Sequence, residues 1–320
     1  MKKCKTRLAL ALLLLYTLPQ TAQAARMLVP VGKVIGLELR NNTVTVAAFD
    51  EESQAKAAGL QTGDRLLTIN GRTVTCAEDV RHALDHSDGA VELTVLRGKT
   101  KSTHHIRPSI TDDGPKLGIY LRQGVTGIGT VTYYDPENQT FGTLGHGVND
   151  GSGELLTLTQ GSAYEARVIG VRKGRSGQPG QLMGTLTSRS ALGSLYRNTT
   201  RGVFGTTETA YEAQSLPVGT WDSVKTGEAT ILSTVTGDTP REYSVEILKI
   251  YPASRSNGRN MLIRVTDPAL LETTGGIVQG MSGSPIIQDG KLVGAVTHVL
   301  VNDPTTGYGI FIENMLDAAA

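Results

Sequence analysis

From residue 108 onwards, the sequence is a series of short apolar runs separated by glycine, proline, asparagine and aspartate. Examples are GIGTVTYYD, YEARVIGV, GEATILSTV, NMLIRV and LVGAVTHVLV. These runs have the length of strands, and turn residues at this spacing are typical of an all-β barrel or sandwich. The 38 glycines among 320 residues support the same conclusion. We therefore predict a mainly β protein, with a helix at its end in IFIENMLDAAA.

The first 25 residues have the three parts of an export signal: basic residues, an apolar run, and the small-residue site Ala22-Gln23-Ala24. The apolar run from Leu8 to Leu18 is shorter than the roughly 20 residues that a membrane-spanning helix needs. We expect export with cleavage, and an uncleaved anchor is the alternative. Cleavage would leave Cys76 as a single cysteine, so we expect no internal disulfide in the exported protein.

Residues 27–107 have a different pattern. The run AGLQTGDRLLTINGRTV combines a short helical turn with a Gly-Asp turn and a tight Asn-Gly hairpin. A second helix is predicted in AEDVRHALDHS, followed by the strand AVELTVLRG. This order resembles a PDZ domain, which binds an extended peptide as an added strand.

By that resemblance, a peptide groove would lie between a strand and the second predicted helix. The residues expected to line it are Ile35, Leu37 and Leu39 on the strand, and Val80 and Leu84 on the helix. A packing module without a free ligand is the alternative to a peptide-binding domain.

Ser282 lies in the segment GGIVQGMSGSPIIQDGKLVGAVTH, in a tight turn with glycines on both sides. A serine hydroxyl becomes a useful nucleophile when an adjacent base takes its proton. The Gly-x-Ser-Gly-x-Pro pattern resembles the nucleophile loop of chymotrypsin-like serine proteases. In that geometry the amides of Gly280 and Ser282 would form an oxyanion hole, and Ser284 would be structural.

His146 is the predicted base, because Gly145 and Gly147 leave its imidazole uncrowded in TFGTLGHGVND. Four of the six histidines lie in or beside the PDZ-like segment, where an exposed helix face or a strand end explains them. His298 follows Ser282 by 16 residues, and we expect it to be a core or loop-anchoring group.

Three segments together resemble the stage IV sporulation protein B peptidase family: GIGTVTYYDPENQTFGTLGHGV, KGRSGQPG, and the C-terminal stretch that begins GGIVQGMSGSP. The resemblance implies a serine endopeptidase with a chymotrypsin-like double β-barrel, with Ser282 as nucleophile and His146 as base. The family's proposed acid matches Asp267. Asp150, Asp303 and the lack of an essential carboxylate remain open alternatives.

The resemblance also implies a biological role. The enzyme would be exported by the mother cell of a spore-forming bacterium into the space around the forespore. There it would cleave the membrane-bound regulatory subunit of an intramembrane metalloprotease, which allows a late sigma-factor precursor to be processed. Self-cleavage near the N-terminus is expected as well. A peptide tail, its own or the target's, would occupy the PDZ-like groove.

The predicted organisation is a signal peptide or membrane anchor at 1–25, a PDZ-like domain at 27–107 and a serine peptidase domain at 108–320. No cofactor is expected, since the sequence has neither zinc-ligand spacing nor a phosphate-binding glycine loop. The near balance of 31 basic and 30 acidic residues argues against nucleic-acid binding.

The alternative functions are a non-catalytic PDZ signalling protein and a general quality-control protease, in which the PDZ domain normally follows the barrel.

Overall fold

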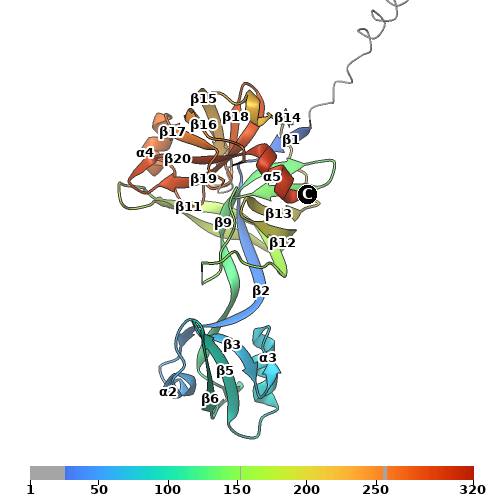
Figure 1. Ribbon diagram of the computed structural model, residues 1–320, viewed down its shortest axis with the longest axis vertical. Helices are drawn as coiled ribbons and strands as arrows, with labels where there is room; N and C mark the ends of the chain where they lie inside the picture. Colours follow the sequence, from blue (N-terminus) through green and yellow to red (C-terminus); the bar gives the residue numbers. More distant parts are fainter. Residues whose placement is uncertain (1–25, 152, 255–257) are drawn as a thin grey trace, which may run out of the picture.

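A computed structural model of the chain describes residues 26–151, 153–254 and 258–320 (Figure 1). The predicted export signal lies outside the described residues. The described part forms two β-barrels and a separate PDZ domain, which confirms the predicted mainly β fold with a double barrel. None of its helices has the length and apolar character that a membrane span requires.

The first barrel is a ring of antiparallel strands that closes on itself. β2 pairs with β9 on one side and with β11 on the other, and β10, β13 and β12 complete the ring between β9 and β11. A short edge, made by β1 and β14, extends the ring beside the end of β9. The strands are β1 (Met27–Pro30), β2 (Val34–Phe49), β9 (Ile119–Asp135), β10 (Thr140–Thr143), β11 (Gln160–Arg172), β12 (Gln181–Thr199), β13 (Gly202–Thr206) and β14 (Leu216–Pro217).

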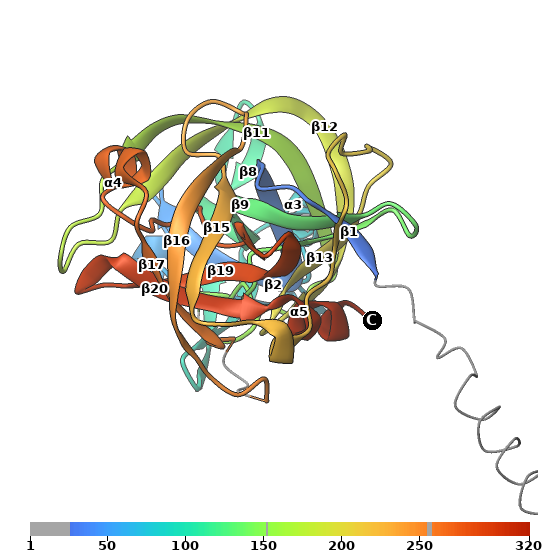
Figure 2. The same ribbon diagram turned by 90° about the horizontal axis from the view of Figure 1, so that it is seen from above.

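The second barrel is also closed, in the order β15-β16-β17-β20-β19-β18. Alternate residues of β16 (Tyr243, Val245 and Ile247) point into its core, as expected for strands with one buried face. Figure 2 shows these strands side by side with those of the first barrel. The elements are η1 (Trp221–Ser223), β15 (Gly227–Ser233), β16 (Arg241–Ile250), β17 (Met261–Val265), α4 (Pro268–Thr274), β18 (Pro285–Gln288), β19 (Lys291–Leu300), β20 (Asp303–Phe311) and α5 (Ile312–Ala319).

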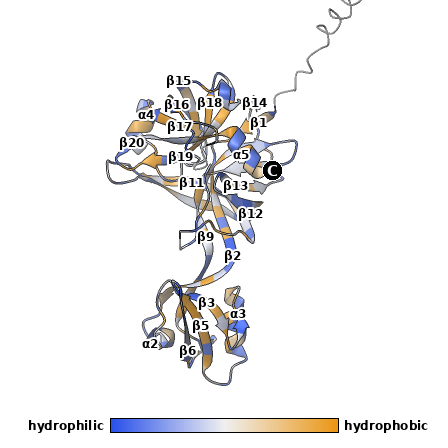
Figure 3. Ribbon diagram, viewed as in Figure 1, coloured by the Kyte–Doolittle hydropathy of each residue, from blue (hydrophilic) through white to orange (hydrophobic). Residues whose placement is uncertain are grey.

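The PDZ domain is inserted into the first barrel between β2 and β9. The second half of β2 and the first half of β9 leave the barrel and continue into the PDZ domain, where β2 pairs with β3 and β3 with β5 in the same continuous sheet (Figure 1). Hydrophobic residues follow these strands in Figure 3, and residues 44–117 supply the fully buried side chains of this domain. Its elements are α2 (Gln54–Ala57), β3 (Arg65–Ile69), β4 (Arg72–Thr73), α3 (Ala77–Asp85), β5 (Val91–Arg97), β6 (Thr100–Ile106), β7 (Ser109–Thr111) and β8 (Gly114–Lys116).

The insertion corrects the predicted domain boundary and the predicted peptide groove. Ile35, Leu37 and Leu39 lie in the first barrel, where β11 and β9 pair with them from both sides. β2 is a continuous strand of 16 residues, and the alternation of its apolar side chains is the same in either domain. The sequence therefore did not reveal where the strand passes from the barrel to the PDZ domain.

The crossing point has its own local geometry. The pairing of β2 with β9 shifts register between Leu39 and Val44, opposite Gly124. Gly124 has a φ of 79°, and a Cβ there would lie 1.9 Å from the carbonyl oxygen of Leu39. Glycine is required because a side chain would push the two strands apart where they bend.

Candidate active site

The Ser282 loop, which precedes β18, packs closely against the first barrel. Gly280 and Gly283 have φ values of 101° and 97°, which favour glycine. A Cβ on Gly283 would lie 2.0 Å from the carbonyl oxygen of Thr130 and 2.6 Å from the amide nitrogen of Leu144. The glycine that follows Ser282 is therefore needed for contact between the barrels as well as for the turn.

Thr130 on β9 connects the serine loop to the histidine segment. Its hydroxyl donates to the Gly280 carbonyl at 2.7 Å, and its amide donates to the Ser282 carbonyl at 3.0 Å. Its own carbonyl accepts from the Thr143 hydroxyl at 2.6 Å and from the Leu144 amide at 3.3 Å. Because Thr130 is fully buried, these bonds fix the two segments relative to each other.

The amides of Gly280 and Ser282 donate no hydrogen bond to any described residue. Both residues line a cleft between the barrels. Two free amides beside a serine hydroxyl are the donors that would stabilise an oxyanion during acyl transfer. This arrangement fits the role expected of Gly280 and Ser282.

His146 follows β10 in the first barrel and lines the same cleft. Its neighbour Gly145 has a φ of 66°, and a Cβ there would lie 2.9 Å from the Thr297 methyl group. His146 Nδ1 lies 2.9 Å from the Gly147 carbonyl oxygen. A carbonyl can only accept, so Nδ1 carries the proton and Nε2 has a free lone pair.

The environment of His146 favours the neutral imidazole. Burial lowers its pKa below the usual 6.5, and the hydrogen bond to the Gly147 carbonyl acts in the opposite direction. A base with a depressed pKa is unprotonated at neutral pH and is ready to accept a proton.

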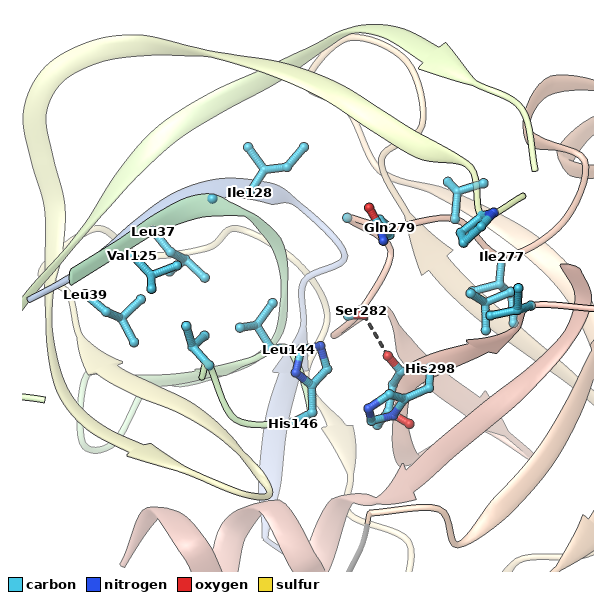
Figure 4. A pocket seen from close by; sticks show the side chains of 18 residues that line it. Leu37, Leu39, Val125, Ile128, Leu144, His146, Ile277, Gln279, Ser282 and His298 are labelled. Atoms are coloured by element: carbon cyan, nitrogen blue, oxygen red, sulfur yellow. Dashed lines mark hydrogen bonds between the residues drawn. The ribbon is translucent and has the colours of Figure 1, made fainter. Parts of the chain in front are cut away.

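Ser282 from the second barrel and His146 from the first barrel lie next to each other in the cleft (Figure 4). The Ser282 hydroxyl donates to the Thr297 carbonyl at 2.7 Å, and no hydrogen bond joins it to His146 within the described residues. Proton transfer to Nε2 therefore requires the hydroxyl to rotate away from Thr297. The structure brings the two predicted residues together with the hydroxyl in this resting orientation.

The structure places Asp267 outside the cleft. Its carboxylate caps the N-terminus of α4, where it accepts from the Leu270 amide at 2.9 Å. The residues that line the cleft include no carboxylate among those the structure describes. The expected acid thus does not meet His146, and the Gly147 carbonyl holds the ring instead.

The two alternative acids also lie elsewhere. Asp303 accepts from the hydroxyls of Thr305 and Thr306, both at 2.6 Å, and these bonds lower its pKa. Asp150 accepts from the Glu154 amide at 3.3 Å in the loop beyond His146. Neither residue lines the cleft.

His298 belongs to the cleft, although the sequence indicated only a structural role. Its ring centroid lies 5.1 Å from that of His146. Burial, together with His146 and Arg259, lowers its pKa to about 4, so the ring is neutral at neutral pH. Its Nδ1 is buried without a hydrogen-bond partner among the described residues. Its position near the end of β19, the second strand of the β18–β19 hairpin that follows Ser282, was a sequence signal that could have indicated this site.

Leu37 and Leu39 line this cleft, and Val80 and Leu84 are buried in the PDZ core. Thr130 was missed, because a buried threonine in a strand has no distinguishing sequence pattern. No group of three or more histidine, cysteine or acidic residues that could hold a metal occurs in the described part of the chain.

A family model described as SpoIVB peptidase S55 matches residues 113–316, and a PDZ domain model matches residues 45–97. Partial similarity is found to two proteins named as zinc metalloproteases. The one from Bartonella henselae is 31% identical over 94 residues, covering 29% of this chain and 26% of that protein. The one from Agrobacterium fabrum is 33% identical over 102 residues, covering 32% and 25%.

The chain thus spans about a quarter of the length of these curated relatives. Among solved structures, the inactive form of the Rv3671c protease is similar with a TM-score of 0.36 and 14% identity, covering 61% of this chain and 82% of that one. An inactive serine-to-alanine mutant of Rv3671c from M. tuberculosis H37Rv gives a TM-score of 0.34 and 15% identity, covering 61% and 80%.

Proposed function

The chain belongs to the SpoIVB peptidase S55 family of serine peptidases, and on that premise we propose that it is an endopeptidase of sporulation signalling. Its proposed substrate is the membrane-bound regulatory subunit that keeps an intramembrane metalloprotease inactive. Cleavage would release that protease to process a late sigma-factor precursor. Self-cleavage near the N-terminus is part of the same proposal.

One observation carries the catalytic part of this proposal. Ser282 and His146 come from different barrels and meet in a cleft that also contains the free amides of Gly280 and Ser282. A nucleophile, a neutral base and two oxyanion donors are the groups that acyl transfer needs.

The geometry supports a specific course for the reaction. The Ser282 hydroxyl turns from Thr297 towards Nε2 of His146, which takes the proton as oxygen attacks the scissile carbonyl. The amides of Gly280 and Ser282 receive the negative charge on the carbonyl oxygen. His146 then gives its proton to the leaving amine. A water molecule next attacks the acyl group on Ser282 while His146 takes the water's proton, and His146 returns that proton to Ser282 as the acid product leaves.

The PDZ domain supplies a separate peptide-binding edge in this proposal. Residues 119–123 of β9 pair with β2 and, within the described chain, with no strand on their other side. α3 contacts β8, which leads into this stretch, and Ile119 and Leu121 pack on the core that contains Val80. A peptide tail could therefore add beside β9.

Export to the space between the mother-cell and forespore membranes completes the proposal. Its support is the N-terminal sequence with the site Ala22-Gln23-Ala24. Mass spectrometry of the exported protein would identify its first residue. A chain that still begins at Met1 would contradict cleavage.

The activity is tested with the full chain and a fluorophosphonate probe, which labels an activated serine. The wild type should be labelled at Ser282, and Ser282→Ala should not be labelled. In the spore-forming host, Ser282→Ala should leave the regulatory subunit and the sigma-factor precursor uncut. If the wild type is labelled but Ser282→Ala cells still process the sigma-factor precursor normally, the chain is a peptidase that does not act in the proposed pathway.

A further inference from the structure

We propose that the cleft selects an extended substrate segment with aliphatic side chains on both sides of the scissile bond and an acidic residue on the acyl side. This inference rests on the proposed peptidase function and names the substrate class of the same site. It is carried by two neighbouring features, an apolar cleft and a basic loop at its margin.

The cleft has a volume of about 430 Å³, and most of the side chains that line it are aliphatic. Its polar side chains are those of His146, Gln279, Ser282, Thr297 and His298, and no Lys, Arg, Asp or Glu is among the described residues that line it. A charged substrate side chain would lose its hydration here without gaining a counter-charge. An aliphatic side chain would instead be removed from water favourably.

Aliphatic residues of both barrels line the cleft, and in Figure 4 Leu37, Leu39, Val125 and Leu144 lie on one side of the Ser282–His146 pair and Ile277 on the other. The first-barrel group contains Leu37, Leu39, Val125 and Leu144, and the second-barrel group contains Ile277, Val278, Val299 and Val301. A peptide bond held at Ser282 would therefore have an apolar surface on each side.

The second-barrel group corresponds to the acyl side of the bond. Residues 277–279 lead directly into the amides of Gly280 and Ser282, which would hold the oxygen of the attacked carbonyl. We assign the residue that carries this carbonyl to the same side, because residues 277–279 line the cleft and are continuous with the amides that would hold its oxygen.

The basic loop lies at the margin of the second-barrel group. Arg172, Lys173 and Arg175 surround a hollow that shares Pro179 with the cleft. All three side chains are exposed, and none forms an ion pair with a described residue. Three unpaired cations on one side would attract an acidic residue of the substrate.

The backbone of the loop is already held in place. The Gly177 amide donates to the Val301 carbonyl at 2.8 Å, and the Gly174 amide donates to the Thr274 carbonyl at 2.8 Å. The Ser176 hydroxyl donates to the Asn302 carbonyl at 2.9 Å. These bonds fix the loop beside Val301, so its charges face the acyl side of a bound segment.

The test measures how synthetic peptides slow fluorophosphonate labelling of the full chain, together with the positions at which the peptides are cut. The peptides share one scaffold with Val, Asp or Lys before the central bond, and with Glu, Gln or Lys three residues earlier. We expect the peptide with Val and Glu to compete at least tenfold better than those with Asp or Lys before the bond. Replacing its Glu by Lys should weaken competition about threefold to tenfold.

Two variants test the assignment at residues outside the catalytic groups. Val301→Asp, at a side chain that is 48% exposed, should increase competition by the peptide with Lys before the bond about fivefold. Arg172→Glu with Arg175→Glu should reverse the preference for Glu. Arg189→Glu, at an exposed residue that lines neither the cleft nor the hollow, is the control and should change neither preference.

The outcomes separate the two proposals. This inference would be overturned, and the peptidase function left in place, by either of two results obtained with Ser282 labelled. In the first, peptides with a charged residue before the bond compete better than the peptide with Val. In the second, both variants leave the preferences unchanged. No labelling and no cleavage by the folded wild type would overturn the peptidase function and, with it, this inference.

Discussion

The Thr130 hydroxyl of the first barrel donates to the Gly280 carbonyl of the second barrel at 2.7 Å. The same residue accepts from Thr143 and Leu144, which lead to His146. The segments that carry the base and the oxyanion amides are therefore positioned through one buried residue, by its side chain and its backbone.

Thr130→Val should lower kcat with little change in KM. Valine has nearly the same shape but lacks the hydroxyl, so about 1 kcal/mol of hydrogen bonding is lost. The Gly280 amide would also be less well placed, and small displacements in a catalytic site can cost up to about 100-fold in rate. Steady-state kinetics on a good peptide substrate would measure both effects.

Thr132→Val is the matched control for that variant. Thr132 is fully buried two residues further along β9, and its hydroxyl has no hydrogen-bond partner among the described residues. Its removal should leave kcat and thermal stability unchanged or slightly raised. Equal losses of kcat in the two variants would show that β9 tolerates no change and would remove the special role of Thr130.

Ser282→Ala and His146→Ala should each abolish nearly all cleavage. The two groups act in one step, so the double variant should be hardly worse than either single variant, with losses on the order of 10⁶-fold as a reference scale. Thermal unfolding must be unchanged for the comparison to hold. Multiplicative losses in the double variant would indicate that the residues act independently.

Asp267→Asn should retain activity within a few-fold of wild type. Asparagine caps a helix about as well as aspartate, and the Asp267 carboxylate accepts from the Leu270 amide. Asp267→Ala should lose about 1 kcal/mol of stability through loss of the cap. A fall on the order of 10⁴-fold in the asparagine variant would restore Asp267 as the group that orients His146.

The acidic limb of kcat/KM should have an apparent pKa below 6.5. Burial lowers the pKa of His146, and its neutral form is the base, so the rate should rise with pH through that depressed value and then level off. A pH profile on the full chain would give the midpoint. A midpoint above 6.5 would mean that a carboxylate meets the ring in the working enzyme.

His298 should make the protein less stable in mild acid. Its pKa is about 4 in the folded chain against 6.5 for a free side chain, so the unfolded chain binds more protons between these values. Stability should therefore fall as the pH is lowered from 6.5 towards 4. In His298→Asn, thermal unfolding over the same range should show a smaller fall, and an identical fall in both proteins would contradict this assignment.

The sequence alone determined the parts that depend on local chemistry. Short apolar runs between turn residues predicted the β fold, and AGLQTGDRLLTINGRTV predicted the PDZ module. Ser282 and His146 stood out in the sequence because each has glycines close by. At these glycines a side chain would strain the backbone or collide with a neighbouring segment. Such requirements are visible within a few residues of the chain.

The tertiary structure decided which distant segments meet. β2 pairs with β9, about 90 residues later in the chain, and this pairing moved Leu37 and Leu39 from the expected PDZ groove to the catalytic cleft. The packing of the two barrels gave Thr130 its hydrogen-bond partners. Asp267 remained at the N-terminus of α4, away from the cleft. Alternating apolar residues show that one face of a strand is buried, but they do not show which partner buries it, because strand pairing is set by contacts between residues far apart in sequence.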